Sequence, residues 1–302
     1  MIVYTACPCC RATNIAKVLT AKDFTVSDEM FEVWQCNVCT LRFTQNIPDK
    51  DEIVKYYKSY NYISHSDTKE GFINSLYHFV RKRTLIAKRN LIIKYSQKMY
   101  FPIKSSEKKI LDIGAGTGAF LHIMQKNDWK VTGIEPDETA RENAKKLYGL
   151  SLQQPEELFT LPAQSFDAIT LWHVLEHVHD LHEYMHQLKK LLKATGNLFI
   201  AMPNYTSYDA KAYKEFWAGY DVPRHLYHFS PTAVTQLLLQ HGLQLKKLKP
   251  MWYDSFYVSM LSEKYKTGKN NFISALITGY VSNWKALYDK EKCSSIIYIV
   301  TH

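Results

Sequence analysis

Short apolar runs alternate with amphipathic stretches along the second half of the chain. The runs predicted as strands are KKILDIG, WKVTGIEP, SFDAITLWHV, GNLFIAMP, LQLKKLKPMW and SSIIYIVTH. Between them lie stretches with helical spacing, such as TGAFLHIMQKND, ETARENAKKLYG and DLHEYMHQLKKLLKATG. Short strands that alternate with helices of about 10–15 residues predict a parallel sheet covered by helices on both faces. The pattern therefore predicts an α/β fold.

The remaining segments divide the chain into three parts. Residues 1–48 hold four paired cysteines and form the first module, residues 49–104 form a mostly helical linker or cap, and residues 105–302 form the α/β domain. Two segments, 204–229 and 254–292, do not fit the strand–helix repeat. We expect both to be insertions beside the last strands, where a cover for the substrate would be built.

Composition places the chain among soluble globular proteins. Of 302 residues, 46% are hydrophobic and 22% are charged. There is no apolar run of about eighteen residues, so we expect no membrane span. The first residues, MIVYTACPCC, lack the basic start and apolar core of a secretion signal. These features predict a cytoplasmic enzyme.

The net charge of +9 is concentrated in residues 77–109, where many Lys and Arg residues face one acid, Glu107. Such a segment can be the solvated face of a helix. It can also be an electropositive rim that attracts an anionic acceptor or RNA. The sequence does not separate these alternatives, and it does not indicate the oligomeric state.

Four of the six cysteines form two close pairs, Cys7 with Cys10 and Cys36 with Cys39. Two C-x-x-C turns can supply the four thiolates of a tetrahedral zinc site. Arg11 and Thr40 stand where a glycine often follows each turn. Disulfides or a redox pair are the alternatives, but disulfides would require an oxidising compartment. We predict a structural zinc ribbon with no open coordination position.

The stretch ILDIGAGTGAFL carries three glycines, Gly114, Gly116 and Gly118, shortly after the acid Asp112. A glycine turn at the carboxyl end of a strand lets the backbone approach a ligand closely. No Lys follows, as a phosphate-binding P-loop requires. A carboxylate would repel a pyrophosphate but would attract an ammonium or sulfonium group.

This stretch resembles the first motif of class I S-adenosylmethionine (SAM) methyltransferases. The resemblance implies a Rossmann-like seven-stranded sheet, with SAM held by Asp112 and by the three glycines that follow it. Glu135, which ends VTGIEP together with Pro136, matches the acid that holds both ribose hydroxyls. The stretch FDAITLWHVLEHV matches the fourth-strand motif and implies that His173 lies beside the cofactor. For the adenine amino group, Gln154 or Glu156 are the candidates.

Proton removal from the acceptor needs a base, and His177 in HVLEHV is the first candidate because imidazole titrates near neutral pH. The alternative is that this motif only packs beside the cofactor. A second polar stretch, DVPRHLYHFS, adds His225 and Tyr227 as candidate catalytic residues, with His228 less favoured. In the structural alternative, Arg224 pairs with Asp221 and the aromatic side chains hold the loop down.

The acceptor is predicted from resemblance. LEHV is similar to quinone-pathway O-methyltransferases, whereas the four-cysteine module and RHLYHFS are similar to deoxysugar C-methyltransferases. A zinc-bearing methyltransferase of ribosomal RNA bases and a non-catalytic zinc-ribbon adaptor are further alternatives. We predict methyl transfer to a small-molecule acceptor, at a hydroxyl oxygen.

Overall fold

The computed structural model describes residues 1–57, 72–96, 107–269 and 271–302. The described chain belongs to two compact units. One comprises Met1–Tyr62, His173–Met185 and Ile200–Ile299, and the other comprises Ile63–Trp172, His186–Phe199 and Val300–His302. The division falls inside strands β7 (Leu192–Pro203) and β10 (Ser295–Thr301), so each of these strands contributes to both units.

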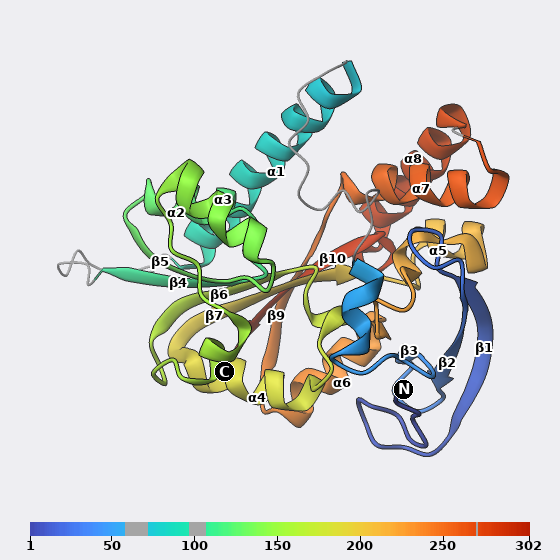
Figure 1. The fold of residues 1–302 in the computed structure, drawn as a ribbon, viewed down its shortest axis with the longest axis horizontal. Helices are drawn as coiled ribbons and strands as arrows, with labels where there is room; N and C mark the ends of the chain where they lie inside the picture. The colour runs from blue at the N-terminus through green and yellow to red at the C-terminus, as the bar shows by residue number, and fades with distance from the viewer. Residues whose placement is uncertain (58–71, 97–106, 270) are drawn as a thin grey trace. The chain divides into compact units, whose positions relative to one another are not determined.

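The predicted α/β sheet has six strands in the order β5–β4–β6–β7–β10–β9 (Figure 1). The strands not yet bounded are β4 (Lys108–Ile113), β5 (Trp129–Ile134), β6 (Phe166–Trp172) and β9 (Gln244–Pro250). β4 pairs in parallel with both β5 and β6. Beside β5, where a seventh strand is expected, Gln153 makes a single parallel bridge with Ile134. Pro155 begins a 3-10 helix, η2 (Pro155–Phe159), and its missing N–H prevents a longer strand there.

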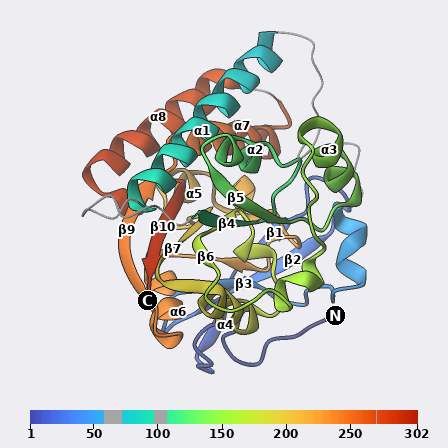
Figure 2. The ribbon, with the colours of Figure 1, turned by 90° about the vertical axis from the view of Figure 1, so that its left-hand side faces the viewer.

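The unit that includes Ile63–Trp172 contains the three glycines after β4, and we call it the glycine-turn unit. Three of its helices lie on one side of β4 and β5 (Figures 1 and 2). They are α1 (Phe72–Ser96), α2 (Ala119–Gln125) and α3 (Glu138–Tyr148). The side chain of Asp137 caps the start of α3 by accepting a 2.6 Å hydrogen bond from the backbone N–H of Ala140. Gly149 ends α3 in the left-handed conformation. Local capping therefore sets both ends of the helix after Glu135.

The expected helical segment 49–104 is described only in part. η1 (Glu52–Tyr57) and α1 account for the described residues of the segment after residue 51 and up to residue 96. Residues 58–71 and 97–106 lie outside the described residues, as do Lys98 and Lys104 of the basic segment.

The cysteine-bearing module forms a four-stranded antiparallel sheet in the order β1–β2–β3–β8. Its strands are β1 (Ile15–Lys22), β2 (Met30–Cys36), β3 (Arg42–Thr44) and β8 (Tyr227–His228). In the pairing of β3 with β8, Phe43 lies opposite Tyr227 and Arg42 lies opposite His228. The second candidate catalytic stretch therefore supplies the last strand of this N-terminal sheet.

Insertion 204–229 packs on the same sheet. It contains α5 (Tyr208–Tyr213), η4 (Lys214–Phe216) and η5 (Ala218–Tyr220). Tyr205, Trp217 and Tyr220 share one buried cluster with Phe31 and Val33 of β2. These aromatic side chains therefore hold the insertion onto the sheet and do not form an open apolar wall.

Insertion 254–292 is a helical hairpin. α7 (Asp254–Thr267) and α8 (Phe272–Tyr288) pack against each other and are followed by η6 (Lys290–Lys292) (Figure 2). The other helical elements are α4 (Leu181–Leu191), η3 (Leu175–His177) and α6 (Pro231–Gln240). The side chain of Ser230 caps α6, and Pro231 stands at its first position, where its missing N–H is not needed.

Candidate functional site

The glycine turn follows β4 directly and has backbone angles that favour glycine. The φ angles are +70° at Gly114, +53° at Gly116 and +77° at Gly118. A Cβ on Gly118 would lie 3.1 Å from Leu150 and 3.2 Å from Ala144, in addition to the strained φ. The turn is therefore held open by residues that could not carry side chains without distortion.

Glu135 lies at the end of β5 and fastens the glycine turn. One carboxylate oxygen accepts a 2.6 Å hydrogen bond from the N–H of Gly116, and the other accepts a 3.0 Å bond from the N–H of Asp137. Arg141 donates to the carbonyls of Glu135 and Pro136. Each carboxylate oxygen keeps lone pairs beyond these bonds, so Glu135 can accept further donors such as ribose hydroxyls.

Asp112 is fully buried in β4 next to the glycine turn. It accepts a 2.6 Å hydrogen bond from the hydroxyl of Thr170 in β6. Burial raises the pKa of Asp112 to about 7, although the bond from Thr170 opposes this shift. A cation beside this carboxyl group would favour its charged form, so the site is suited to a positively charged ligand.

Gln153, which bridges to Ile134 of β5, was not selected from the sequence. Its side-chain oxygen is buried and accepts no hydrogen bond from the described residues. Gln154 and Glu156, the candidates for the adenine amino group, are exposed. The backbone N–H of Gln153 donates to the carbonyl of Gly133, and its carbonyl accepts from Glu135. The bridge to β5 therefore places the unpartnered oxygen of Gln153 beside the strand that ends at Glu135.

Two residues of the basic segment contact other parts of the glycine-turn unit. Arg81 lies 3.5 Å from the hydroxyl of Thr117 in the glycine turn, and Lys88 lies over the ring of Trp172 at 4.2 Å. By contrast, Lys82 and Lys94 are exposed. The segment therefore combines residues that contact the glycine-turn unit with residues that face solvent.

His173 follows β6 directly and belongs to the unit that includes the four-cysteine module. His173 has a positive φ of 59°, and its ring lies between two carboxylates: Nδ1 is 3.4 Å from Glu176 and Nε2 is 3.1 Å from Asp254. Burial alone would lower the pKa of His173, but its ion pairs with the carboxylates of Asp254 and Glu176 outweigh this effect and raise the pKa to about 9. His173 is therefore a cation at neutral pH.

His177 and His225 lie together, with their rings at 76° and their centroids 4.7 Å apart. Nδ1 of His177 is 3.0 Å from the carbonyl oxygen of Arg224 and also 3.0 Å from the hydroxyl of Tyr57. Burial, with repulsion from His225, lowers the pKa of His177 to about 4. Because a carbonyl only accepts, Nδ1 of neutral His177 carries the hydrogen and Nε2 holds the free lone pair.

Glu176 completes this cluster. Its carboxylate is buried, and neither oxygen accepts a hydrogen bond from the described residues. Burial raises the pKa of Glu176, but His173 outweighs this effect and the net pKa is lowered. Ligand atoms of Glu176, His177 and His225 all lie within 4.8 Å of one another. This spacing suits proton transfer and is also within reach of one cation.

Tyr227 and His228 stand apart from this contact. The hydroxyl of Tyr227 donates to the carbonyl of His179 at 3.0 Å and lies 3.4 Å from the hydroxyl of Tyr4. His228 is buried with its Nε2 3.2 Å from the hydroxyl of Thr44, and burial lowers its pKa well below the usual value. The structure thus brings His177 and His225 into direct contact, while the two β8 residues have partners in the N-terminal sheet and in the loop before α4.

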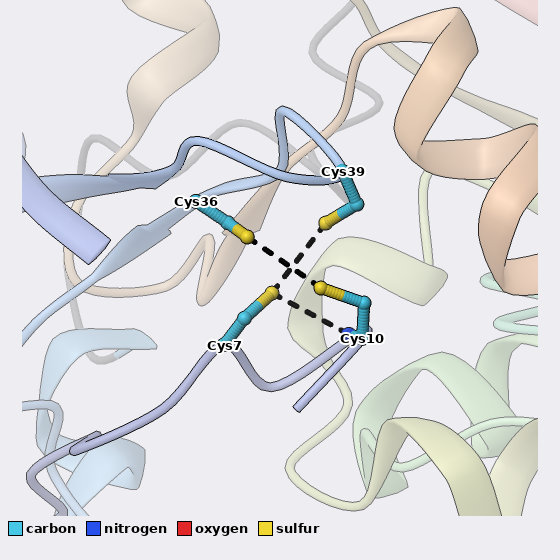
Figure 3. Close-up of side chains that lie close together, drawn as sticks. All are labelled: Cys7, Cys10, Cys36 and Cys39. Atoms are coloured by element: carbon cyan, nitrogen blue, oxygen red, sulfur yellow. Dashed lines mark hydrogen bonds between the residues drawn. The ribbon is translucent and has the colours of Figure 1, made fainter. Parts of the chain in front are cut away.

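The four paired cysteines point their sulfur atoms at one another (Figure 3). The Sγ atoms of Cys7 and Cys39 are 3.5 Å apart, as are those of Cys10 and Cys36, and all four are free thiols rather than disulfides. Tetrahedral zinc with Zn–S bonds of about 2.3 Å places its sulfur ligands about 3.8 Å apart. The cluster therefore fits a structural zinc ion.

The backbone of the two cysteine turns explains why they manage without glycine. Arg11 and Thr40 adopt the left-handed conformation, with φ of 65° and 64°. The N–H of Arg11 donates to the carbonyl of Cys7, and the N–H of Thr40 donates to that of Cys36. Each turn therefore accepts the conformational cost that a glycine would have avoided.

A model of the methyltransferase domain family matches residues 81–248, more than half of the chain. The chain belongs to this methyltransferase family. It is a class I SAM-dependent methyltransferase, and SAM binding is implied by membership of the family. The predicted α/β fold and enzyme class are thereby confirmed.

Relatives of this methyltransferase include ubiquinone biosynthesis O-methyltransferases. The one from Pelagibacter ubique (strain HTCC1062) is 28% identical over 70% of this chain and 90% of its own length. The one from Histophilus somni (strain 2336) is 38% identical over 33% of this chain. The chain spans about half, 47%, of the length of the Histophilus relative.

Two solved structures to which this chain is similar are also methyltransferases by name. A SAM dependent methyltransferase from Archaeoglobus fulgidus is 18% identical, with a TM-score of 0.45 over 75% of this chain and 100% of that chain. Phosphoethanolamine N-methyltransferase 2 of Haemonchus contortus, in complex with S-adenosyl-L-methionine, is 14% identical, with a TM-score of 0.48 over 71% and 52%.

Proposed function

We propose that this methyltransferase transfers the methyl group of SAM to a hydroxyl oxygen of a small-molecule acceptor, with His177 as the base. The observation that carries the proposal is the state of His177. The carbonyl oxygen of Arg224 fixes the hydrogen on Nδ1 and leaves Nε2 as the proton acceptor. The pKa of about 4 keeps the ring neutral, but it also makes Nε2 a weaker base than the near-neutral imidazole that the sequence predicts. The relatives named as O-methyltransferases support oxygen as the methylated atom.

For the cofactor, we propose a site made of Asp112, Glu135, Pro136 and the three glycines of the turn, which all belong to one unit. His173, the remaining residue that the resemblance implies, belongs to the other unit and stays a prediction. Bound SAM supplies a methyl carbon activated by its sulfonium. Glu135 would accept the ribose hydroxyls with the lone pairs that its bonds to Gly116 and Asp137 leave free. The unpartnered oxygen of Gln153 would accept from the adenine amino group. Open backbone, an unused amide acceptor and buried acids all fit a cationic adenosyl ligand.

At the acceptor, His177 would take the hydroxyl proton at Nε2 as the oxygen bonds to the methyl carbon. The bond from that carbon to the sulfonium sulfur would break, and the sulfur would leave as a neutral thioether. Protonated His177 would lie beside Glu176, whose buried carboxylate is charged and accepts no hydrogen bond from the described residues. That carboxylate would stabilise the imidazolium that forms. His225 would orient the acceptor from the neighbouring ring, and Tyr227 would support the loop through its bond to His179.

A second candidate is C-methylation of a nucleotide-linked sugar. The observation that favours it is that His225 and Tyr227 lie on a segment that is paired with the four-cysteine module through β3 and β8. A carbon acid also needs a base, and His225 directly contacts His177.

For the metal, we propose structural zinc at the four cysteines.

The proposal is tested with methyl-labelled SAM and three acceptor sets: hydroxylated aromatic compounds, nucleotide sugars and ribosomal RNA transcripts. Label recovered as an acid-stable ether on a hydroxyl compound supports the proposal. Label on sugar carbon would favour the second candidate, and label on RNA alone would overturn both. The active acceptor is then assayed with and without added Mg²⁺. Transfer that requires the added ion would assign Glu176, His177 and His225 to metal binding instead of proton transfer.

A further inference from the structure

The α7–α8 hairpin buries its small residues. From α7 the buried positions include Ser255, Ser259 and Ser262, and from α8 they are Ala275, Gly279, Ser282 and Ala286. At the closest approach, a Cβ on Gly279 would lie 2.7 Å from the ring of Phe256 and 3.2 Å from the carbonyl of Ser255. The two backbones therefore approach closely because small side chains separate them.

A buried hydrogen bond fixes which side of α8 faces the protein. The hydroxyl of Ser282 donates to the carboxylate of Asp209 at 2.7 Å. Asp209 is fully buried and also accepts from the ring N–H of Trp217 and the hydroxyl of Ser294. Rotating α8 to bury its larger residues would leave this carboxylate short of a donor, which is costly. The orientation of the helix is thus set from within.

The opposite side of α8 is large, apolar and exposed. Ile277 is 59% exposed, Tyr280 is 67% exposed and Leu287 is 67% exposed. The full exposed set on α8 is Phe272, Ile273, Leu276, Ile277, Tyr280, Trp284, Leu287 and Tyr288. Their spacing of three and four residues makes one continuous stripe. Burial of small residues with exposure of large apolar ones is the reverse of ordinary helix packing in water and is typical of helices that contact lipid.

Most of the exposed charges of the hairpin are basic. Exposed lysines occur at the α7 end and turn (Lys264, Lys266, Lys269) and at the α8 end and beyond (Lys285, Lys290). Two acids of the hairpin are turned inward: Glu263 is buried and accepts from Ser274, and Asp254 pairs with His173. Only Asp289 and Glu291 are exposed acids among the described residues of 254–292. The fringe of the stripe therefore complements an anionic surface.

We propose that the α7–α8 hairpin docks this methyltransferase on the surface of a bilayer that contains anionic phospholipids. No helix among the described residues has the length and apolar character needed to cross a membrane, so α8 would lie in the plane of the interface. Tyr280, Trp284 and Tyr288 supply aromatic rings of the kind that favour the headgroup region, and the lysines contact anionic headgroups. The face would thus be covered by lipid.

The test is co-sedimentation of the full chain with vesicles of phosphatidylcholine alone and of phosphatidylcholine with about a third phosphatidylglycerol. We expect binding to the anionic vesicles, a decrease with added salt, and about a tenfold lower partition coefficient for the double variant Ile277→Ser with Tyr280→Ser. The matched control is Leu147→Ser with Leu239→Ser, two exposed apolar residues away from the hairpin, which should bind like the parent. Circular dichroism confirms that each variant is folded.

Trp284 gives an independent readout. Addition of anionic vesicles should shift the tryptophan emission to shorter wavelength in the parent protein, and Trp284→Phe should remove most of that shift. Absence of vesicle binding by the folded parent would overturn the proposal. Light scattering supplies the other contrary result: a dimer of the parent that dissociates in the Ile277→Ser/Tyr280→Ser variant would show that a second copy covers the stripe. Both results are independent of which acceptor is methylated.

Discussion

Nη2 of Arg224 lies 2.9 Å from Oδ1 of Asp23, although 201 residues separate them in the chain. Both side chains are fully buried. Arg224 also pairs with Asp221 at 2.7 Å and donates to the carbonyl of Tyr56. Asp23 in turn accepts hydrogen bonds from Thr25 and Ser27, just after β1. This network ties the loop that carries His225 to the four-cysteine module, so the two act as one structural element.

Replacing Arg224 should therefore destabilise the protein strongly. Arg224→Met would leave the carboxylates of Asp23 and Asp221 without their cation, which typically costs about 3–5 kcal/mol in a buried pair. Urea unfolding measures this loss, and the control is Lys211→Met, which removes an exposed cation from the same insertion. Equal midpoints for the two variants would show that the buried ion pair contributes nothing to stability.

Much of the cofactor side of the site could be predicted from sequence because its chemistry is local. Gly114, Gly116 and Gly118 follow one strand within five residues, and glycine permits the positive φ angles that all three adopt. The four-cysteine cluster could be predicted equally well, because two short turns carry all four residues. In both cases a few consecutive residues determine the geometry.

The acceptor side was less predictable because its contacts are distant in sequence. The contact of His177 with Arg224 spans 47 residues, and the burial that lowers its pKa depends on the whole packed insertion. The exposed stripe on α8 was also missed, because a helix with apolar residues on one face ordinarily buries that face. The opposite orientation depends on contacts distant in sequence, such as the bond between Ser282 and Asp209.

The role of Glu135 is tested by SAM binding. Glu135→Gln keeps the size of the side chain but replaces one acceptor oxygen with a donor, which would disrupt the bond from Gly116 and the proposed ribose contacts. We expect SAM affinity to fall by about 10²-fold, as for loss of two charge-assisted hydrogen bonds. Titration calorimetry measures this change. Glu138→Gln, an exposed acid in the first turn of α3, is the control and should bind SAM normally.

The pH dependence of methyl transfer tests His177 as the base. Its pKa of about 4 means that the ring is neutral, and able to accept a proton, at every pH above that value. We therefore expect kcat/KM to stay level from pH 8 down to about 5 and to fall only near pH 4. His177→Ala should lower kcat by about 10²–10⁴-fold with SAM affinity kept, whereas the exposed His186→Ala should have little effect. An acid limb near the ordinary histidine pKa of about 6.5 would argue against this assignment.

His173 should make the free energy of unfolding depend on pH in the alkaline range. Its pKa is raised from 6.5 to about 9 in the folded protein, so the folded state holds a proton that the unfolded chain releases. The stabilisation is fully present below pH 6.5 and is lost as the pH rises through 9. Urea midpoints measured from pH 6 to 10 should decline in the parent and decline less in His173→Gln. Parallel declines would show that the carboxylates of Glu176 and Asp254 do not hold this proton.

Loss of the proposed zinc should destabilise the module and, through it, the loop that carries His225. Cys36→Ser removes one thiolate from the cluster, and we expect the bound zinc to fall from about one per chain to near zero, with a lower thermal midpoint. Cys9→Ser is the matched control because Cys9 is equally buried within the first cysteine turn yet lies outside the four-sulfur cluster. Metal analysis after gel filtration measures zinc content.

Since β3 pairs with β8, Cys36→Ser should also lower methyl transfer, and the decrease should exceed any change in SAM affinity because the glycine turn belongs to the other unit. Full zinc retention in Cys36→Ser would contradict the four-cysteine site, and normal methyl transfer by a zinc-free variant would separate the module from catalysis.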